Sequence, residues 1–235
     1  MELSHFESLY PDSSRFEEIE KILSYIKEGN SCQLISVPGA GRLNLFGLLT
    51  YNTKVRFKHL GENQKWFHFV YLNFSEVKEK SLLDITKFIF IGLLDSLKER
   101  KMEDDYEEIS KIFKESLNFN DPMVIFSGLK KAIDYLAIER QLNIIFLFDR
   151  FETYTANLTS EFFTNLKILR NRAKYRFSCV FSLNRPLEDT IEPELFSDFY
   201  EFIIGHTVYL PIFDKLGSVI GISRTINSVL MSFER

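Results

Sequence analysis

The chain has 235 residues, which is long for one minimal domain and short for two full ones. Hydrophobic residues make up 45% of it and charged residues 26%, a balance that excludes a disordered, collagen-like or low-complexity protein. The formal net charge of −4 argues against a surface coated in basic groups for nucleic acid, although it is compatible with a local basic patch. We therefore expect one α/β domain over residues 1–235.

The sequence gives no sign of a membrane or secretory protein. No run reaches the ~20 apolar residues of a bilayer crossing, and the most apolar segment, 82–97, contains three charged residues and predicts a buried amphipathic helix. The first ten residues lack the pattern of a secretory signal. Cys32 and Cys179 fall in predicted core strands and are expected to be buried, reduced thiols. We expect a cytoplasmic protein without a membrane partner.

The amino-terminal third predicts a helix, a strand and a second helix. Apolar residues recur at helical spacing after Ser13 and Ser14, either of which is suited to cap the helix, and Gly29 is suited to end it. A buried strand is expected at 32–37 (CQLISV). It leads directly into the sequence PGAG at 38–41, after which helical spacing resumes. The order strand, glycine turn, helix is the first functional indication.

The remaining elements continue this alternation. Five apolar strands separated by helices predict a five-stranded parallel sheet flanked by helices, a three-layer α/β sandwich. Besides the elements above, we expect a loop at 54–58, strands at 67–74, 144–149, 177–183 and 207–213, and helices at 81–100, 103–118, 121–141, 160–171 and 214–235.

The glycine turn partly matches a phosphate-binding loop. In the pattern G-x-x-x-x-G-K-[ST], backbone N–H groups surround phosphates, the lysine reaches the terminal ones and the hydroxyl binds Mg²⁺. Only Gly41 matches strictly. Ser36 stands at the first glycine, Arg42 replaces the lysine and Leu43 replaces the hydroxyl residue. Taken alone, PGAG is equally compatible with a plain tight turn.

Two further strand ends carry polar residues. Asp149 ends one predicted strand and is followed by Arg150, and Asn184 ends the next strand. Ligands of parallel sheets bind at the carboxyl ends of the strands, so both are candidate site residues, with Asp149 as a candidate Mg²⁺ ligand. A lone aspartate at this position is also often a helix cap or a salt-bridge partner.

Together these segments resemble the AAA+/STAND class of P-loop ATPases, in particular its origin-recognition-like and signalling branch. The resemblance covers roughly 10–234 and rests on order and spacing. It comprises Ser14-Arg15-Phe16-Glu17-Glu18 as the box in the first helix, the loop at 38–43, four hydrophobic residues at 145–148 before Asp149-Arg150, and Asn184 as the polar sensor. The family usually continues into a helical lid. Only about 22 residues follow Phe213, so we expect the lid to be absent, reduced or outside this chain.

The resemblance implies ATP or ADP as cofactor, with or without Mg²⁺. It would place the adenine near Arg15, although such an arginine more often forms a surface ion pair. Asn184 would approach the terminal phosphate. The implied phosphate-binding residues are Pro38, Gly39, Ala40, Gly41, Arg42 and Leu43.

Departures from the family pattern predict impaired or absent hydrolysis. Leu43 cannot bind Mg²⁺, and Arg150 stands where the family has a catalytic glutamate, a role that a guanidinium cannot fill. Asn44 or Glu152 would substitute only from a displaced register. We expect a switch or assembly module rather than an efficient ATPase. The alternative is a nucleotide-free pseudo-NTPase scaffold in which a side chain such as Arg42 or Phe46 fills the phosphate site.

A basic cluster near the end of the predicted helix 160–171 leaves three interpretations open. It is a solvated helix end, an arginine finger at an interface with another protein or a second copy, or a nucleic-acid patch of a loader or remodeller subunit. The acidic run at 103–108 is a possible partner in a neighbouring molecule. The cluster comprises Lys167, Arg170, Arg172, Lys174 and Arg176, with Arg185 nearby.

Overall fold

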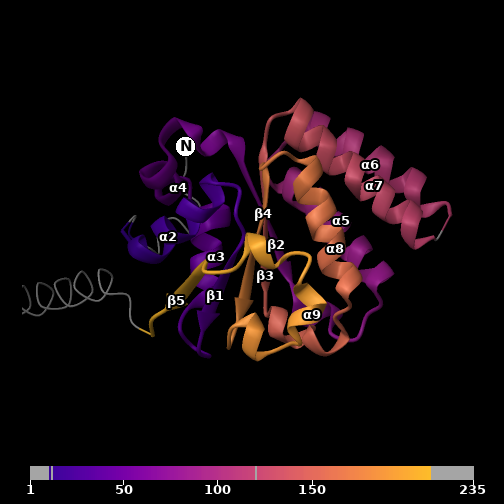
Figure 1. The fold of residues 1–235 in the computed structure, drawn as a ribbon. Coiled ribbons are helices and arrows are strands. Elements are labelled where there is room, and N and C mark those ends of the chain that lie inside the picture. The colour runs from indigo at the N-terminus through magenta and orange to yellow at the C-terminus, as the bar shows by residue number, and fades with distance from the viewer. Residues whose placement is uncertain (1–10, 12, 120, 213–235) are drawn as a thin grey trace, which may run out of the picture.

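Five parallel strands form one sheet in the order β2-β3-β4-β1-β5. The computed structural model describes residues 11, 13–119 and 121–212, and helices lie on both sides of its sheet (Figure 1). This confirms the predicted three-layer α/β architecture. The strands are β1 (Cys32–Ser36), β2 (Phe67–Asn73), β3 (Asn143–Asp149), β4 (Phe177–Leu183) and β5 (Thr207–Leu210).

The helices divide between the two faces of the sheet, as Figure 1 shows to the left and right of the strands. The first face carries α2 (Phe16–Lys27), α3 (Arg42–Tyr51) and α4 (Thr53–Leu60). The second carries α5 (Leu82–Glu99), α6 (Glu103–Leu117), α7 (Pro122–Asp134) and α8 (Ser160–Arg172), and the short α9 (Pro193–Phe196) follows β4.

Successive side chains along each strand point to opposite faces of the sheet, and this gives two separate hydrophobic cores. In β3, Ile145 and Leu147 pack with α2 and α3, whereas Phe146 and Phe148 pack with the helices of the second face. Because both faces are covered, strand residues are apolar in continuous runs, which made these strands recognisable in the sequence.

Phenylalanine rings dominate the second core. Phe151 lies 4.9 Å from Phe181 and 5.0 Å from Phe74, measured between ring centroids, and these contacts are edge-to-face. Phe148 approaches both Phe74 and Phe181 in the same way. Such geometry is the favourable one for aromatic pairs. The abundance of phenylalanine therefore serves packing.

Several predicted boundaries were wrong. The predicted loop at 54–58 is helix α4, begun by Asn52, whose side chain accepts a 3.0 Å hydrogen bond from the amide of Val55. The predicted helix 121–141 ends as an α-helix at Asp134 and continues as one π-helical turn. Strand β5 ends at Leu210, before the predicted end at 213. The predicted helix at 214–235 lies outside the described residues.

Burial of the two thiols agrees with the prediction. Cys32 and Cys179 are fully buried and unpaired, and burial raises the pKa of the Cys32 thiol to about 12. Across the ranges that the structure describes, no helix combines the length and the apolar character needed to cross a bilayer.

The parallel strand register gathers the carboxyl ends of the strands at one edge of the sheet and their amino ends at the other. Asn73 pairs with Asp149, and Ile35 pairs with Leu183 one residue before Asn184. The carboxyl ends of β1, β3 and β4 therefore meet at one edge, where the predicted site residues lie. The amino ends of β2, β3 and β4 meet at the opposite edge.

Candidate functional site

The loop at 38–41 connects β1 to α3 through two glycines in the left-handed region. Gly39 has φ 86° and Gly41 has φ 83°, conformations that cost an L-residue with a side chain roughly 1–2 kcal/mol. The amide of Ala40 donates a 3.2 Å hydrogen bond to the Val37 carbonyl. Gly41 occupies the N-cap of α3 and makes no side-chain cap. The helix therefore begins with amides that no cap side chain satisfies, as anion-binding helix termini do.

Arg42 connects this loop to the end of β3. Its Nε lies 3.0 Å from Oδ1 of Asp149, and its Nη1 lies 3.2 Å from Oε1 of Glu152. All three side chains are largely buried, which strengthens their charge interactions. The cation expected to face phosphates is therefore bound by two carboxylates.

Asp149 has partners at both carboxylate oxygens. Besides Arg42 at Oδ1, the Tyr71 hydroxyl donates to Oδ2 at 2.8 Å and the Arg150 amide donates to Oδ1 at 2.9 Å. Burial and the neighbouring carboxylate raise the pKa of Tyr71 above its ordinary value, so that the phenol stays a donor. Tyr71 was not among the predicted site residues, because nothing in the sequence of β2 marks it.

Arg15 lies beside the loop, as its assignment to the site requires. Its guanidinium donates to the carbonyl of Ala40 at 2.7 Å and to the carbonyl of Pro211 at 2.8 Å, and it lies 3.9 Å from Glu18. Arg15 therefore holds the glycine loop against the segment after β5. It is also the N-cap of α2, in a left-handed conformation, so the predicted cap at Ser13 or Ser14 was wrong.

The other strand-end residues are exposed. Leu43 is 62% exposed at the first turn of α3, and Asn44 beside it is also exposed. Asn184 and Arg185 are exposed directly after β4. The loop residues, Asp149 and Asn184 are thus brought to one edge, as the sequence predicted.

The basic cluster is not one continuous patch. Lys167 forms a 3.1 Å ion pair with Asp198, and Arg172 is paired with Asp134. Arg170 is buried, with its guanidinium 3.7 Å from the ring centroid of Phe202 and donating to a backbone carbonyl. These three side chains are engaged with groups of the fold around α8.

This site could hold phosphates on loop amides, but it offers little to a metal ion. Asp149 is engaged with Arg42, and the Leu43 side chain has no oxygen to offer. In the part of the chain that the structure describes, no three His, Cys, Asp or Glu side chains cluster as metal ligands.

No protein-family model matches this chain, and neither does any curated protein sequence. The AAA+/STAND resemblance accordingly stays a prediction from motif order and spacing.

Proposed function

We propose that the chain is a nucleotide-binding module that holds ATP or ADP phosphates on the loop at 38–43 and hydrolyses them inefficiently or not at all. The supporting observation is the connection of β1 to α3 through two left-handed glycines, with Arg42 facing Asp149 from the neighbouring strand end. A helix N-terminus with free amides attracts anions, and the glycines let a phosphate approach the backbone.

In this proposal Arg42 changes partners when nucleotide binds. Phosphate oxygens compete with Asp149 and Glu152 for the guanidinium, whose planar fork suits phosphate as well as carboxylate. When Arg42 leaves, Asp149 keeps the Tyr71 hydroxyl and the Arg150 amide as donors. Nucleotide binding would thus loosen the link between α3 and the segment after β3, which gives the module a switch.

Slow hydrolysis follows from the side chains around the loop. Leu43 cannot bind Mg²⁺, and Arg150, exposed at the end of β3, cannot accept a proton from water. Glu152 is a carboxylate of suitable chemistry beside the loop, but Arg42 binds it. Loss of such groups costs several kcal/mol of transition-state stabilisation each.

One observation favours a second candidate, a nucleotide-free interaction module. Arg42 already has two carboxylate partners, so phosphate binding must first break a largely buried pair. Breaking such pairs is costly when a partner stays buried and uncompensated.

Calorimetric titration with ATP and ADP, with and without Mg²⁺, distinguishes these candidates. We expect micromolar binding that does not depend on Mg²⁺ and that Arg42→Ala weakens by roughly tenfold or more, the effect of losing a charge-assisted hydrogen bond. Lys131→Ala, which removes one exposed positive charge from α7 on the other face of the sheet, is the matched control. No heat and no thermal stabilisation at millimolar nucleotide would establish the nucleotide-free module instead.

A further inference from the structure

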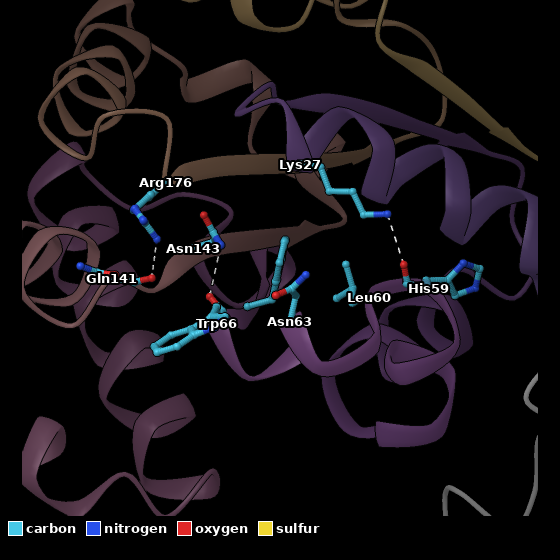
Figure 2. A pocket seen from close by; sticks show the side chains of 9 residues that line it. Lys27, His59, Leu60, Asn63, Trp66, Gln141, Asn143 and Arg176 are labelled. Carbon is cyan, nitrogen blue, oxygen red and sulfur yellow. Dashed lines mark hydrogen bonds between the residues drawn. The ribbon is translucent and has the colours of Figure 1, made fainter.

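A polar pocket lies at the amino ends of the strands, opposite the glycine loop. We call it the amino-edge pocket; its volume is about 380 Å³. Figure 2 shows Lys27 and Arg176 on opposite sides of it, with Asn63, Trp66 and Asn143 between them. Its remaining lining residues are His59, Leu60, Phe67 and Gln141.

The lining of the amino-edge pocket is cationic. It includes two positive side chains, Lys27 and Arg176, and no carboxylate. Each cation donates to a backbone carbonyl, Lys27 to that of His59 and Arg176 to that of Gln141. Neither forms an ion pair with a carboxylate of the described residues. In a chain of net charge −4, this gives the pocket a local positive lining, and the carboxylate of Glu20 behind it is bonded to Nδ1 of His59.

Two exposed aromatic rings accompany these cations: Trp66 lines the pocket, and Tyr175 is the chain neighbour of Arg176. Trp66 is 40% exposed, with the ammonium of Lys65 lying 5.2 Å from its ring centroid. Tyr175 is 66% exposed and precedes Arg176, and the Arg170 guanidinium lies 4.9 Å from its ring centroid, which leaves the exposed side of the ring for a base. It packs against Gly29 at the end of α2, so closely that a Cβ on Gly29 would lie 2.7 Å from the Tyr175 Cβ. Large rings exposed beside unpaired cations are typical of surfaces that bind nucleobases and phosphates together.

The distribution of ion pairs within the basic cluster indicates the same edge of the sheet. Lys167, Arg170 and Arg172 are engaged within the fold, whereas Lys174 and Arg176 have no carboxylate partner among the described residues. Lys174 and Arg176 flank Tyr175 on the connection between α8 and β4. Within 167–176, the available cations are therefore Arg176, which lines the amino-edge pocket, and Lys174 two residues before it, whereas Arg185 is exposed at the opposite edge of the sheet.

We propose that this edge binds single-stranded nucleic acid. Bases stack on Trp66 and Tyr175, while Lys27 and Arg176 bind the phosphates between them. A single strand exposes the faces of its bases for stacking, which a duplex does not, and its phosphates match a lining without carboxylates. The amides of Asn63 and Asn143 add hydrogen-bonding groups at the pocket.

Trp66 is the only tryptophan of the chain, so its fluorescence reports on this site directly. The probe is a deoxythymidine oligomer of roughly ten nucleotides, within the usual site size of such surfaces. We expect saturable quenching of Trp66, with an affinity that falls as salt rises. The double variant Lys27→Gln/Arg176→Gln is expected to weaken binding and to reduce the slope of log K against log salt by about 1.4 for two lost phosphate contacts.

The stacking of bases on Trp66 is tested by measuring the fluorescence anisotropy of a labelled oligomer as protein is added. Trp66→Ala is expected to weaken binding by roughly tenfold, and Trp66→Phe to restore much of it, because phenylalanine keeps a face for stacking. The matched control for charge is Lys114→Gln/Lys131→Gln, which removes two exposed lysines from α6 and α7 and should leave binding unchanged.

The proposal would be overturned by no quenching at low salt, by equal binding of duplex and single strand, or by equal affinity for thymidine monophosphate and the oligomer. An acidic peptide that displaces the oligomer at comparable affinity would likewise show a site for polyanions of another class. The proposal is independent of the glycine loop, since Arg42→Ala should leave oligomer binding unchanged whether or not ATP binds.

Discussion

A buried histidine at the start of β2 has its tautomer fixed by its neighbours. The Arg100 guanidinium can only donate, so Nδ1 of His68 accepts this bond at 3.1 Å, and the ring proton is on Nε2. Nε2–H donates to the Ser96 hydroxyl at 2.8 Å, which donates to the Leu93 carbonyl. Protonation of His68 would place a second ring proton against a guanidinium. The network therefore requires neutral His68.

This network predicts acid sensitivity. Burial, followed by the charges of Arg100 and Arg56, lowers the pKa of His68 to about 3, against an ordinary value of about 6.5 in the unfolded chain. Between these values the unfolded state binds one more proton, so the contribution of His68 is complete above about pH 6.5 and declines as the pH falls. The expected loss is about 1.4 kcal/mol of unfolding free energy per pH unit.

Urea unfolding between about pH 7 and pH 5 measures this effect, because the carboxylates that drive acid denaturation titrate mostly below this range. His68→Gln retains polar atoms for Arg100 and Ser96 but cannot titrate, so its stability should depend less steeply on pH than that of the parent chain. Parallel pH profiles of the two proteins would contradict the expectation.

At the scale of elements, α6 packs closely against a glycine of α7. A Cβ built on Gly128 would lie 2.0 Å from the Ser116 hydroxyl, 3.1 Å from the Ser116 Cβ and 3.3 Å from the ring of Phe90. Gly128→Ala is therefore expected to reduce the free energy of unfolding by about 1–3 kcal/mol through overpacking, although alanine is the better helix former. Chemical denaturation measures this loss.

A double-mutant cycle isolates the contact as the cause. Ser116→Ala removes the closest atom, so Gly128→Ala should cost less in that background than in the parent chain. Equal costs in both backgrounds would show that the loss comes from elsewhere on α7.

The sequence predicted most elements because local physics determines them. Strands such as β3 are continuous apolar runs of strand length, which burial on both faces requires. The errors about α2 and α4 arose where a single capping residue determines where a helix begins. The polar segment of α4 looked like a loop because the capping role of Asn52 was overlooked. The start of α2 depends on Arg15, whose side chain reaches carbonyls far away in the chain.

The sites were predictable to different degrees. Asp149 and Arg42 were recognised because motif order places both at one edge of a parallel sheet. Their mutual pairing, and the role of Tyr71, depend on side-chain directions that no spacing encodes. The amino-edge pocket was missed because its lining residues come from four separate segments, and only Arg176 among them stood out as part of a charge cluster.

At the scale of the whole molecule, one sheet separates two edges of different chemistry. The carboxyl edge carries the glycine loop, where Arg42 is neutralised by two carboxylates. The amino edge carries cations without carboxylate partners and two exposed rings. A nucleotide-dependent movement of α3 would reach the amino edge through the sheet only if the sheet behaves as one rigid unit. The cooperativity of unfolding therefore bears on any coupling between the two edges.

Single cooperative unfolding is the expected behaviour, because the ring cluster of the second core joins β3, β4 and the helices over them. Trp66 reports on the amino edge and circular dichroism on the helices, so their urea transitions should coincide. Phe151→Ala, at a fully buried ring in contact with Phe74 and Phe181, should shift both transitions by the same amount, about 3–5 kcal/mol of unfolding free energy. Phe151→Leu, which retains most of the volume, should cost less. Transitions that separate in either variant would show that the edges unfold independently, and a rigid sheet could not then couple them.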